Sequence, residues 1–278
     1  MPEPAPLLRH QDLVRALDGI DVLDVVSREL VRRHHGDELA HTGGTDVAVS
    51  AEVTTVEGHD GAPACLLPNQ SLHMIGLAAL TVLATRVLTG PAAVTATILG
   101  EGPAAHLHLA LLARYTPHLS GAAVRPAAHQ RVQWDANLLI IAESGWGAPV
   151  VETPKPGVLI INASRRDLPD RVLAEVDRLY VDDLGLLEHN QHRTFVQWHR
   201  ACRENGAGAD RVPGSPAPWR DQRRIDCDLG RLLCGGQVDP VGDDVVLVEL
   251  MDGGSLLARL AADLYQAAIV LGVHPADP

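Results

Sequence analysis

Apolar residues recur at helical spacing between residues 22 and 31, and this pattern predicts an amphipathic helix near the start of the chain. Asp21 stands where an N-cap residue is expected, and Gly36 can end the helix in a left-handed conformation. From residue 45 to 67 the pattern changes to short β-branched stretches broken by glycine and aspartate, which is typical of strands joined by a tight turn. The first part of the chain therefore predicts a helix followed by a small sheet.

Residues 72–88 are apolar on nearly every side of a helix and stop at a Gly-Pro pair, which predicts a buried helix. An apolar strand follows at residues 94–100 and runs through a glycine-rich turn into another helical stretch, as at the start of a βαβ unit. Further apolar runs are continuous, as in strands covered on both faces, so we expect a parallel sheet. They occupy residues 138–143, 158–164 and 179–183.

The last part of the chain predicts a long polar helix from Leu186 to Arg203, followed by a Gly/Pro-rich loop. After that loop come a strand, a Gly-Gly turn and a helix from Ser255 to Leu271 that ends at Gly272. The alternation of strands and helices indicates an α/β protein whose parallel sheet is of the Rossmann type.

Charge and composition narrow the choice of partners. The formal net charge is -12 and Lys155 is the only lysine, whereas binding to a nucleic-acid backbone requires clustered cations. Hydrophobic residues make up 46% of the chain and aromatic residues only 3%, so the core is aliphatic and the fold needs no cross-links. We therefore expect a small-molecule or carrier- or peptide-attached substrate and no nucleic acid.

The cysteines form no C-x-x-C pair, and the N-terminal residues show neither the basic start nor the apolar core of a signal peptide. The longest apolar stretch is interrupted by polar residues before it reaches the about 18 to 20 residues that span a bilayer. These features predict a soluble cytoplasmic protein with reduced thiols and no membrane partner.

The glycine-rich turn at residues 100–105 has the pattern G-x-G-x-x-A between a predicted strand and a predicted helix. Gly100 allows the tight turn, Gly102 lets a pyrophosphate approach the backbone, and Ala105 replaces the third glycine at the contact between helix and strand. The N-terminus of the helix offers unpaired N–H groups to phosphate oxygens. We interpret the turn as a dinucleotide-binding site, with a purely structural turn as the alternative. Its expected cofactor-binding residues are Gly100, Gly102, Pro103 and Ala104.

The end of the next predicted strand bears on the choice between NAD and NADP. An NAD-type site uses an acid there to hold the ribose 2′-hydroxyl, but residues 123–126 contain none. Arg125 can instead pair with a 2′-phosphate, which favours NADP over NAD. A solvated arginine after a strand is the other interpretation, so both cofactors stay open.

Residues 136–183 are similar to the ornithine cyclodeaminase/mu-crystallin family in the order and spacing of their parts. The family shows an Ala-Asp strand, a Thr-x-Thr-like loop, a proline, a Pro-Gly-x-x-Ile-Asn strand, an aspartate and a Val-Asp-Asp strand end. The residues in step are Asn137, Glu143, Pro149, Pro156, Gly157, Asn162, Asp167, Asp182 and Asp183. Both flanking regions also resemble the family, so the chain looks like a shortened, divergent member.

The resemblance implies a Rossmann-type dinucleotide-binding domain, residues 91–244, inserted in a smaller α+β domain for the substrate and dimerisation, residues 1–90 with 245–278. It also implies a homodimer and places Glu143 and Ser144 beside the cofactor. The family's catalytic aspartate, which handles protons or the amine near the nicotinamide, falls on Asp167. The alternative for that residue is a cap on the helix that begins near Pro169.

The chain departs from the family where the substrate carboxylate would bind. Members usually supply two arginines and a lysine from the N-terminal domain, but residues 42–44 and Gly76 stand at the arginine positions and no lysine precedes Lys155. A buried carboxylate without cationic partners is costly, so an ordinary free amino acid is not the expected substrate. His41, His59 and His73 lie in this domain, and we take His73 as the candidate acid, with solvent-exposed histidines as the alternative.

Two other kinds of site are not expected. The histidines of the predicted polar helix, His189, His192 and His199, have no cysteine or carboxylate cluster to complete a metal site, and we interpret the helix as solvated. Residues 145–147, Gly-Trp-Gly, lack the nucleophile of a hydrolase elbow.

The sequence therefore favours an NAD(P)-dependent oxidoreductase that reduces an imine or oxidises an amine on an atypical amino-acid-derived substrate, in specialised metabolism. A cofactor-free family member that acts as a binding partner is the first alternative. Redox-neutral cyclodeamination is another, although the missing carboxylate clamp counts against it.

Overall fold

A computed structural model describes the chain as two compact units. One unit comprises Met1–Leu83 with Asp252–Pro278, and the other is the continuous segment Ala84–Met251. The family resemblance implies the corresponding boundaries at 90/91 and 244/245. The described residues are 5–36, 46–58, 61–126, 136–142, 154–204, 224–236, 241–251 and 253–273.

The first unit opens with helices. These are α1 (His10–Ala16), the 3-10 turn η1 (Leu17–Gly19) and α2 (Val22–His34). The carboxylate of Asp21 accepts hydrogen bonds from two backbone N–H groups of the first turn of α2, so this residue is the N-cap that the sequence predicts. Gly36 follows the helix with a φ of 70°, the left-handed conformation expected of a glycine at this position.

A small antiparallel sheet follows α2 along the chain. It consists of β1 (Val47–Val49), β2 (Val53–Glu57) and β3 (Pro63–Pro68), in that order. Gly61, in the connection between β2 and β3, has a φ of 73°, which confirms the glycine-dependent turn. Alternate residues of β2 and β3 are buried, as expected for a sheet with one face on a core.

The helix α8 (Gly254–Val270) returns the end of the chain to the first unit. It packs against α1, α2, β1 and β2 and buries a row of leucines and alanines. Gly272 ends the helix with a φ of 65°, as predicted. The first unit is therefore assembled from both ends of the chain.

The helix α3 (Asn69–Thr89) leads along the chain from the first unit into the second. It extends beyond the predicted residues 72–88 at both ends, and Gly90 follows it with a φ of 56°. In the described part of the chain, this one helix is long and apolar enough to cross a membrane, but most of that stretch is buried inside the protein. Such burial is typical of the core helix of a folded domain.

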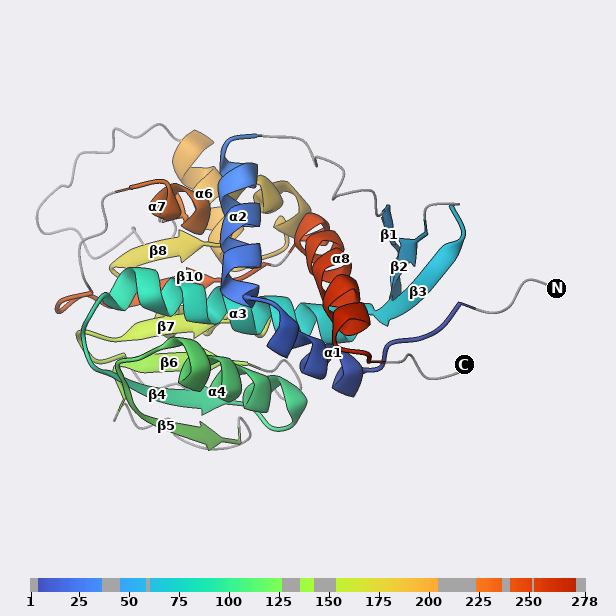
Figure 1. Cartoon of the computed structure of the whole chain (residues 1–278). Coiled ribbons are helices and arrows are strands. Elements are labelled where there is room, and N and C mark those ends of the chain that lie inside the picture. The colour runs from blue at the N-terminus through green and yellow to red at the C-terminus, as the bar shows by residue number, and fades with distance from the viewer. Residues whose placement is uncertain are drawn as a thin grey trace, which may run out of the picture. The chain divides into compact units, whose positions relative to one another are not determined.

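Parallel strands form the sheet of the second unit (Figure 1). Their order is β5-β4-β6-β7-β10-β8-β9, and every neighbouring pair is parallel. The strands are β4 (Val94–Leu99), β5 (Leu119–Arg125), β6 (Leu138–Ile141), β7 (Leu159–Asn162), β8 (Arg178–Val181), β9 (Cys227–Asp228) and β10 (Val246–Glu249). The predicted fold class, a Rossmann-type sheet beside a smaller α+β part, is confirmed.

The core of the second unit lies around its central strands. Every residue of β6, β7 and β10 is buried, as their continuous apolar sequences predict. Side chains such as Leu139, Ile160 and Leu247 form one cluster with Phe195 and Val196. Most of the edge strand β5 is exposed.

The helical segments of the second unit lie between its strands in sequence. They are α4 (Pro103–Tyr115), α5 (Asp170–Leu173), η2 (Leu184–Asn190), α6 (Thr194–Glu204) and α7 (Leu229–Leu233). Of these, α4 packs against β4 and β5.

The prediction of a single polar helix from Leu186 to Arg203 is wrong. The structure has the 3-10 segment η2 and then α6, with a break at residues 191–193. The break has a physical cause, because the carboxylate of Asp167 accepts hydrogen bonds from the backbone N and the hydroxyl of Thr194. A cap supplied from 27 residues earlier in the chain starts a new helix at this point.

Candidate functional site

The strand order changes direction around β4, and this defines a topological switch point. The chain proceeds from β4 to β5 on one side and then to β6 on the other. The connections at the carboxyl ends therefore diverge, and in open α/β sheets this is where ligands bind. The edge is well ordered: the backbone N of Gly100 donates to the carbonyl of Arg125 at 2.9 Å, and that of Ala142 donates to Leu99 at 2.9 Å.

The glycine turn lies at this switch point. Gly100 has a φ of 150° and Gly102 a φ of 88°, and a side chain would be strained in these conformations. Gly102 is the N-cap of α4 and Pro103 its first residue, and no side chain caps the first turn. Ala105 is fully buried, as expected for the small residue at the contact between helix and strand. Since the N-cap residue is a glycine, it supplies no side-chain acceptor to the first backbone N–H groups of α4, such as that of Ala104, and groups of this kind bind phosphate oxygens.

The other residues predicted to bind the cofactor are placed as follows. Arg125 is the last residue of β5, pairs in register with Leu99 and lies beside Gly100. Its half-buried side chain therefore starts at the strand end where a ribose or its 2′-phosphate would lie. Glu143 and Ser144 lie outside the described residues.

A buried polar cluster lies further along the same edge, at the ends of β7 and β10. We use this name for Asn162, Arg193 and Glu249, which are all almost completely buried. Asn162 and Glu249 end neighbouring parallel strands and are in register. The side-chain amide of Asn162 donates to both carboxylate oxygens of Glu249, at 3.1 and 2.9 Å. Two side chains at one level of the sheet thus form the base of the cluster.

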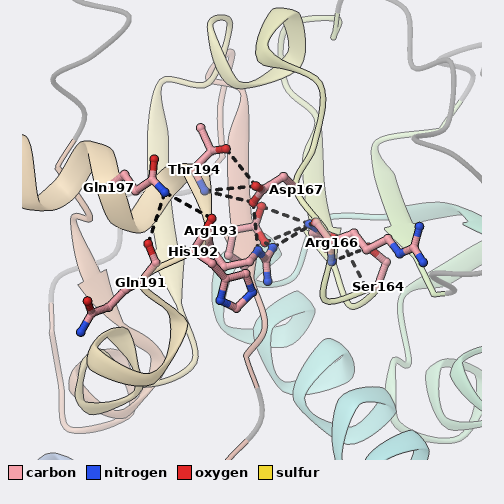
Figure 2. Close-up of polar contacts among 10 residues, drawn as sticks. Ser164, Arg166, Asp167, Gln191, His192, Arg193, Thr194 and Gln197 are labelled. Carbon is pink, nitrogen blue, oxygen red and sulfur yellow. Dashed lines mark hydrogen bonds and ion pairs between the residues drawn. The ribbon is translucent and has the colours of Figure 1, made fainter.

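Arg193 links the buried polar cluster to Asp167 (Figure 2). Its Nη2 donates to Glu249 at 2.6 Å and to the carbonyl of Arg166 at 3.0 Å, and its Nε donates to Asp167 at 2.9 Å. The guanidinium also lies 5.1 Å from the centroid of the Phe195 ring. Burial raises the pKa of Glu249 to about 7, although Arg193 and Asn162 both favour its carboxylate form.

Hydrogen bonds from the buried polar cluster fix the loop from Ser164 to Asp167. The Asn162 amide donates to the carbonyl of Arg166 at 2.7 Å, and its oxygen accepts from the hydroxyl and the backbone N of Ser164. Arg165, in the middle of the loop, has a φ of 61°, and it is the only residue other than glycine with a positive φ in the described part of the chain. Such a conformation persists where the surroundings enforce it, and it is frequent at functional sites.

Asp167 is a well-held but accessible carboxylate. Its oxygens accept from Arg193 Nε, the Thr194 hydroxyl and the Thr194 backbone N. These bonds leave part of its acceptor capacity unused, because an ionised carboxylate has about four lone-pair positions. The side chain is 37% exposed. Asp167 therefore caps a helix, although this is α6 and not the predicted helix near Pro169, and it can also contact a ligand.

The remaining candidates belong to the first unit or to the segment after β8. His73 is half-buried on α3 in the first unit, whereas His41, His59 and residues 42–44 lie outside the described residues. His199 is buried and its Nδ1 accepts the backbone N–H of Ile225 at 3.1 Å, so the interpretation as a solvated residue is wrong for it. Searching the described residues reveals no group of His, Cys, Asp or Glu side chains arranged to hold a metal ion.

The sequence predicted the glycine turn, Arg125 and Asp167 as candidate site residues, but it did not point to Arg193 and Glu249. A signal for Glu249 was present, since it is a carboxylate that ends an otherwise apolar strand predicted to be buried. Such a residue needs a partner, because burying an unpaired charge is costly. Nothing local identifies Arg193 as that partner, which lies 56 residues away.

Comparison with known proteins defines the class of fold. No family model and no curated protein matches the sequence. Solved structures match over almost the whole chain, and they include cyclodeaminases and NAD-linked reductases. The expected resemblance to the ornithine cyclodeaminase/mu-crystallin family is therefore confirmed as a likeness of fold.

Three structures illustrate the similarity. CmnK shares 19% identity with a TM-score of 0.69, and the match covers 98% of this chain and 97% of that chain. The Δ1-pyrroline-2-carboxylate reductase of Thermococcus litoralis, solved with NADH and L-proline, shares 15% identity with a TM-score of 0.66 and coverages of 98% and 99%. A probable ornithine cyclodeaminase from Bordetella pertussis Tohama I shares 15% identity with a TM-score of 0.64 and coverages of 98% and 100%.

Proposed function

We propose that this protein is an NAD(P)-dependent oxidoreductase that acts on a C–N bond, reducing an imine or oxidising an amine of an atypical amino-acid-derived substrate in specialised metabolism. The observation that carries the proposal is the glycine turn at the switch point, where Gly100 and Gly102 adopt positive φ values before a helix whose N-cap residue has no side chain. The Thermococcus litoralis reductase, which has the same fold, was solved with NADH.

The residues present at the turn fit a dinucleotide. Gly102 has no side chain to obstruct a pyrophosphate, and the first N–H groups of α4 supply hydrogen-bond donors for its oxygens. Arg125 lies at the strand end beside the turn and would pair with a 2′-phosphate, which favours NADP. A bound nicotinamide would supply or accept the hydride, and the protein would supply position and proton handling.

Asp167 is the residue that we propose for contact with the reacting nitrogen. Its carboxylate is fixed by Arg193 and Thr194 yet remains partly exposed at the carboxyl edge of the sheet. In this position it would hold a protonated amine or take a proton from it. His73 in the first unit is proposed as a second proton carrier. A homodimer and a cytoplasmic location remain predictions.

The proposal is tested by calorimetric titration of the full chain with NADPH and NADH. Gly102→Asp places a carboxylate and a strained residue where the pyrophosphate would lie, and we expect it to abolish binding. Gly121→Asp is the matched control, because it adds the same charge at an open position on β5, and it should bind the cofactor as the wild type does. Tighter binding of NADPH than NADH would support the proposed role of Arg125.

A second candidate is a cofactor-free protein that acts as a binding partner. The hydrogen bonds of Asp167 to α6 favour it, since they give this residue a structural role without any catalysis. If neither cofactor binds to the wild type, the oxidoreductase proposal is wrong and this candidate replaces it. Saturable binding that Gly102→Asp abolishes and Gly121→Asp retains decides for the enzyme.

A further inference from the structure

The loop between β7 and α5 carries two exposed arginines at the carboxyl edge of the sheet. Arg165 and Arg166 are both exposed, whereas Asn162 and Ser164 just before them are buried. Within the described part of the chain, neither guanidinium group makes an ion pair with an acidic side chain.

The backbone that carries these arginines is fixed from inside the protein. The Asn162 amide and Arg193 Nη2 both donate to the carbonyl of Arg166, at 2.7 and 3.0 Å. The Ser164 hydroxyl lies 3.3 Å from the backbone N of Arg166 and donates to Asn162 at 2.6 Å. These contacts enforce the left-handed conformation of Arg165, which is strained for a residue with a side chain.

Stability alone does not explain the buried polar cluster and the strained backbone of Arg165. A buried ion pair contributes little net stability, because the desolvation of both charges offsets their attraction. A rigid backbone favours ligand binding, because less conformational entropy is lost when the ligand binds. The residues that this backbone presents outward are Arg165, Arg166 and Asp167.

The position of the loop suits a substrate. It follows β7, and β6 alone separates β7 from β4, which leads into the glycine turn. Two strand spacings correspond to about 10 Å along the edge. Of the described acidic side chains in this loop and in the first turn of α5, Asp167 is hydrogen-bonded to Arg193 and Thr194, and Asp170 is exposed and is followed by Arg171. Among the described residues, no acidic side chain forms an ion pair with either exposed guanidinium group, so both are available to a ligand.

We infer that Arg165 and Arg166 form a binding site for an oxyanionic group of the substrate, either a carboxylate or a phosphate. Guanidinium groups match both oxyanions through paired N–H donors. The inference deepens the proposed function and rests on it, since it assigns the anionic end of the substrate to this loop and the reacting nitrogen to Asp167.

The test uses the full chain and two probes, oxalate for a carboxylate and inorganic phosphate, titrated calorimetrically at low ionic strength. We expect millimolar or tighter binding of one probe, and at least a tenfold loss of affinity in Arg165→Gly and in Arg166→Ala. Arg165→Gly should at the same time raise the melting temperature, since glycine adopts the positive φ without strain. Gain of stability with loss of binding separates a ligand contact from a structural role.

The matched control is Arg171→Ala, which removes another exposed arginine on α5 and should bind the probe as the wild type does. The inference is overturned if neither probe binds, if Arg165→Gly and Arg166→Ala bind as the wild type does, or if Arg171→Ala loses as much affinity as they do. Titrations of the same proteins with NADPH and with NADH keep the two proposals apart. Cofactor binding without anion binding removes only this inference, and anion binding that depends on the two arginines without cofactor binding removes only the proposed function.

Discussion

The glycine turn and the buried polar cluster lie at the same edge of one sheet but are built in opposite ways. The turn consists of backbone groups, and its defining residues, Gly100 and Gly102, contribute by having no side chain. The cluster consists of side chains, and Asn162, Arg193 and Glu249 come from three segments far apart in sequence. The backbone groups of the turn therefore suit contact with a ligand, whereas the side chains of the cluster are buried, hydrogen-bond to one another and fix a loop.

This difference determines what a mutation should reveal in each region. Changes at the turn should alter ligand binding more than stability, because few contacts depend on the glycines. Changes in the cluster should alter stability first, because removing one partner leaves a buried charge or amide unsatisfied.

The largest effect is expected for Arg193→Ala. It leaves the Glu249 carboxylate buried without its cation and removes a hydrogen bond from Asp167, so we expect a loss of about 3–5 kcal/mol in the free energy of unfolding. Urea denaturation measures this change in the free energy of unfolding. The loss should be greater at pH 8 than at pH 5, since protonation relieves the unpaired carboxylate. Arg200→Ala, on the exposed side of α6, is the control and should change stability by less than about 0.5 kcal/mol. A loss no larger than that of the control would show that the cluster is not a structural unit.

An intermediate effect is expected for Glu249→Gln, and it depends on pH. Burial raises the pKa of Glu249 from 4.5 to about 7, so the folded protein retains a proton that the unfolded chain releases in this interval. The contribution of this proton to stability is complete below pH 4.5 and is lost as the pH rises through 7. Glutamine does not titrate, so the stability of the variant relative to the wild type should increase by about 1–3 kcal/mol across this interval.

His108 contributes to stability with a pH dependence opposite to that of Glu249. It is buried on α4, and its pKa is lowered from 6.5 to about 4 by burial, so its contribution is present above pH 6.5 and is lost as the pH falls through 4. The two groups oppose each other in the wild type. Denaturation curves of Glu249→Gln from pH 4 to 8 should therefore rise more steeply with pH than those of the wild type, and parallel curves would contradict the assignment of the slope to Glu249.

The smallest effect on stability is expected for Gly102→Ala at the turn. A φ of 88° with a ψ of -163° is a region that only glycine populates readily, so we expect a loss of about 1–2 kcal/mol. Gly121→Ala, in an open position on β5, should not be destabilised in this way. Thermal denaturation measures both. If both variants have the same stability, the turn tolerates a side chain and its glycines are not required by the backbone.

Much of the fold could be predicted because the signals are local. The apolar run of β4, the two glycines and the helix after them follow one another directly, and each step has one physical interpretation. The buried strands β6 and β7 were predicted for the same reason. The place of β10 between β7 and β8 could not be predicted, because it depends on which strands meet after the whole chain has folded.

The same distinction between local and long-range signals applies to the residues of the candidate site. Gly100, Gly102 and Arg125 were found from neighbouring residues, and Asp167 from the resemblance to a family. The break before α6 was missed because its cause, Asp167, lies in another segment, and helical spacing alone carries no information about it. An arginine that forms a long-range ion pair, such as Arg193, cannot be distinguished in the sequence from a solvated arginine on a helix.

The insertion of one unit into the other affects the order in which the protein can form during synthesis. The segment Ala84–Met251 is continuous, so all the strands of its sheet leave the ribosome before residue 252. The first unit forms later, since α8 packs against α1, α2, β1 and β2 and is made after every strand of the second unit. The N-terminal helices and the small sheet therefore remain without this packing partner while the parallel sheet of the second unit assembles, and the synthesis of α8 then completes the first unit.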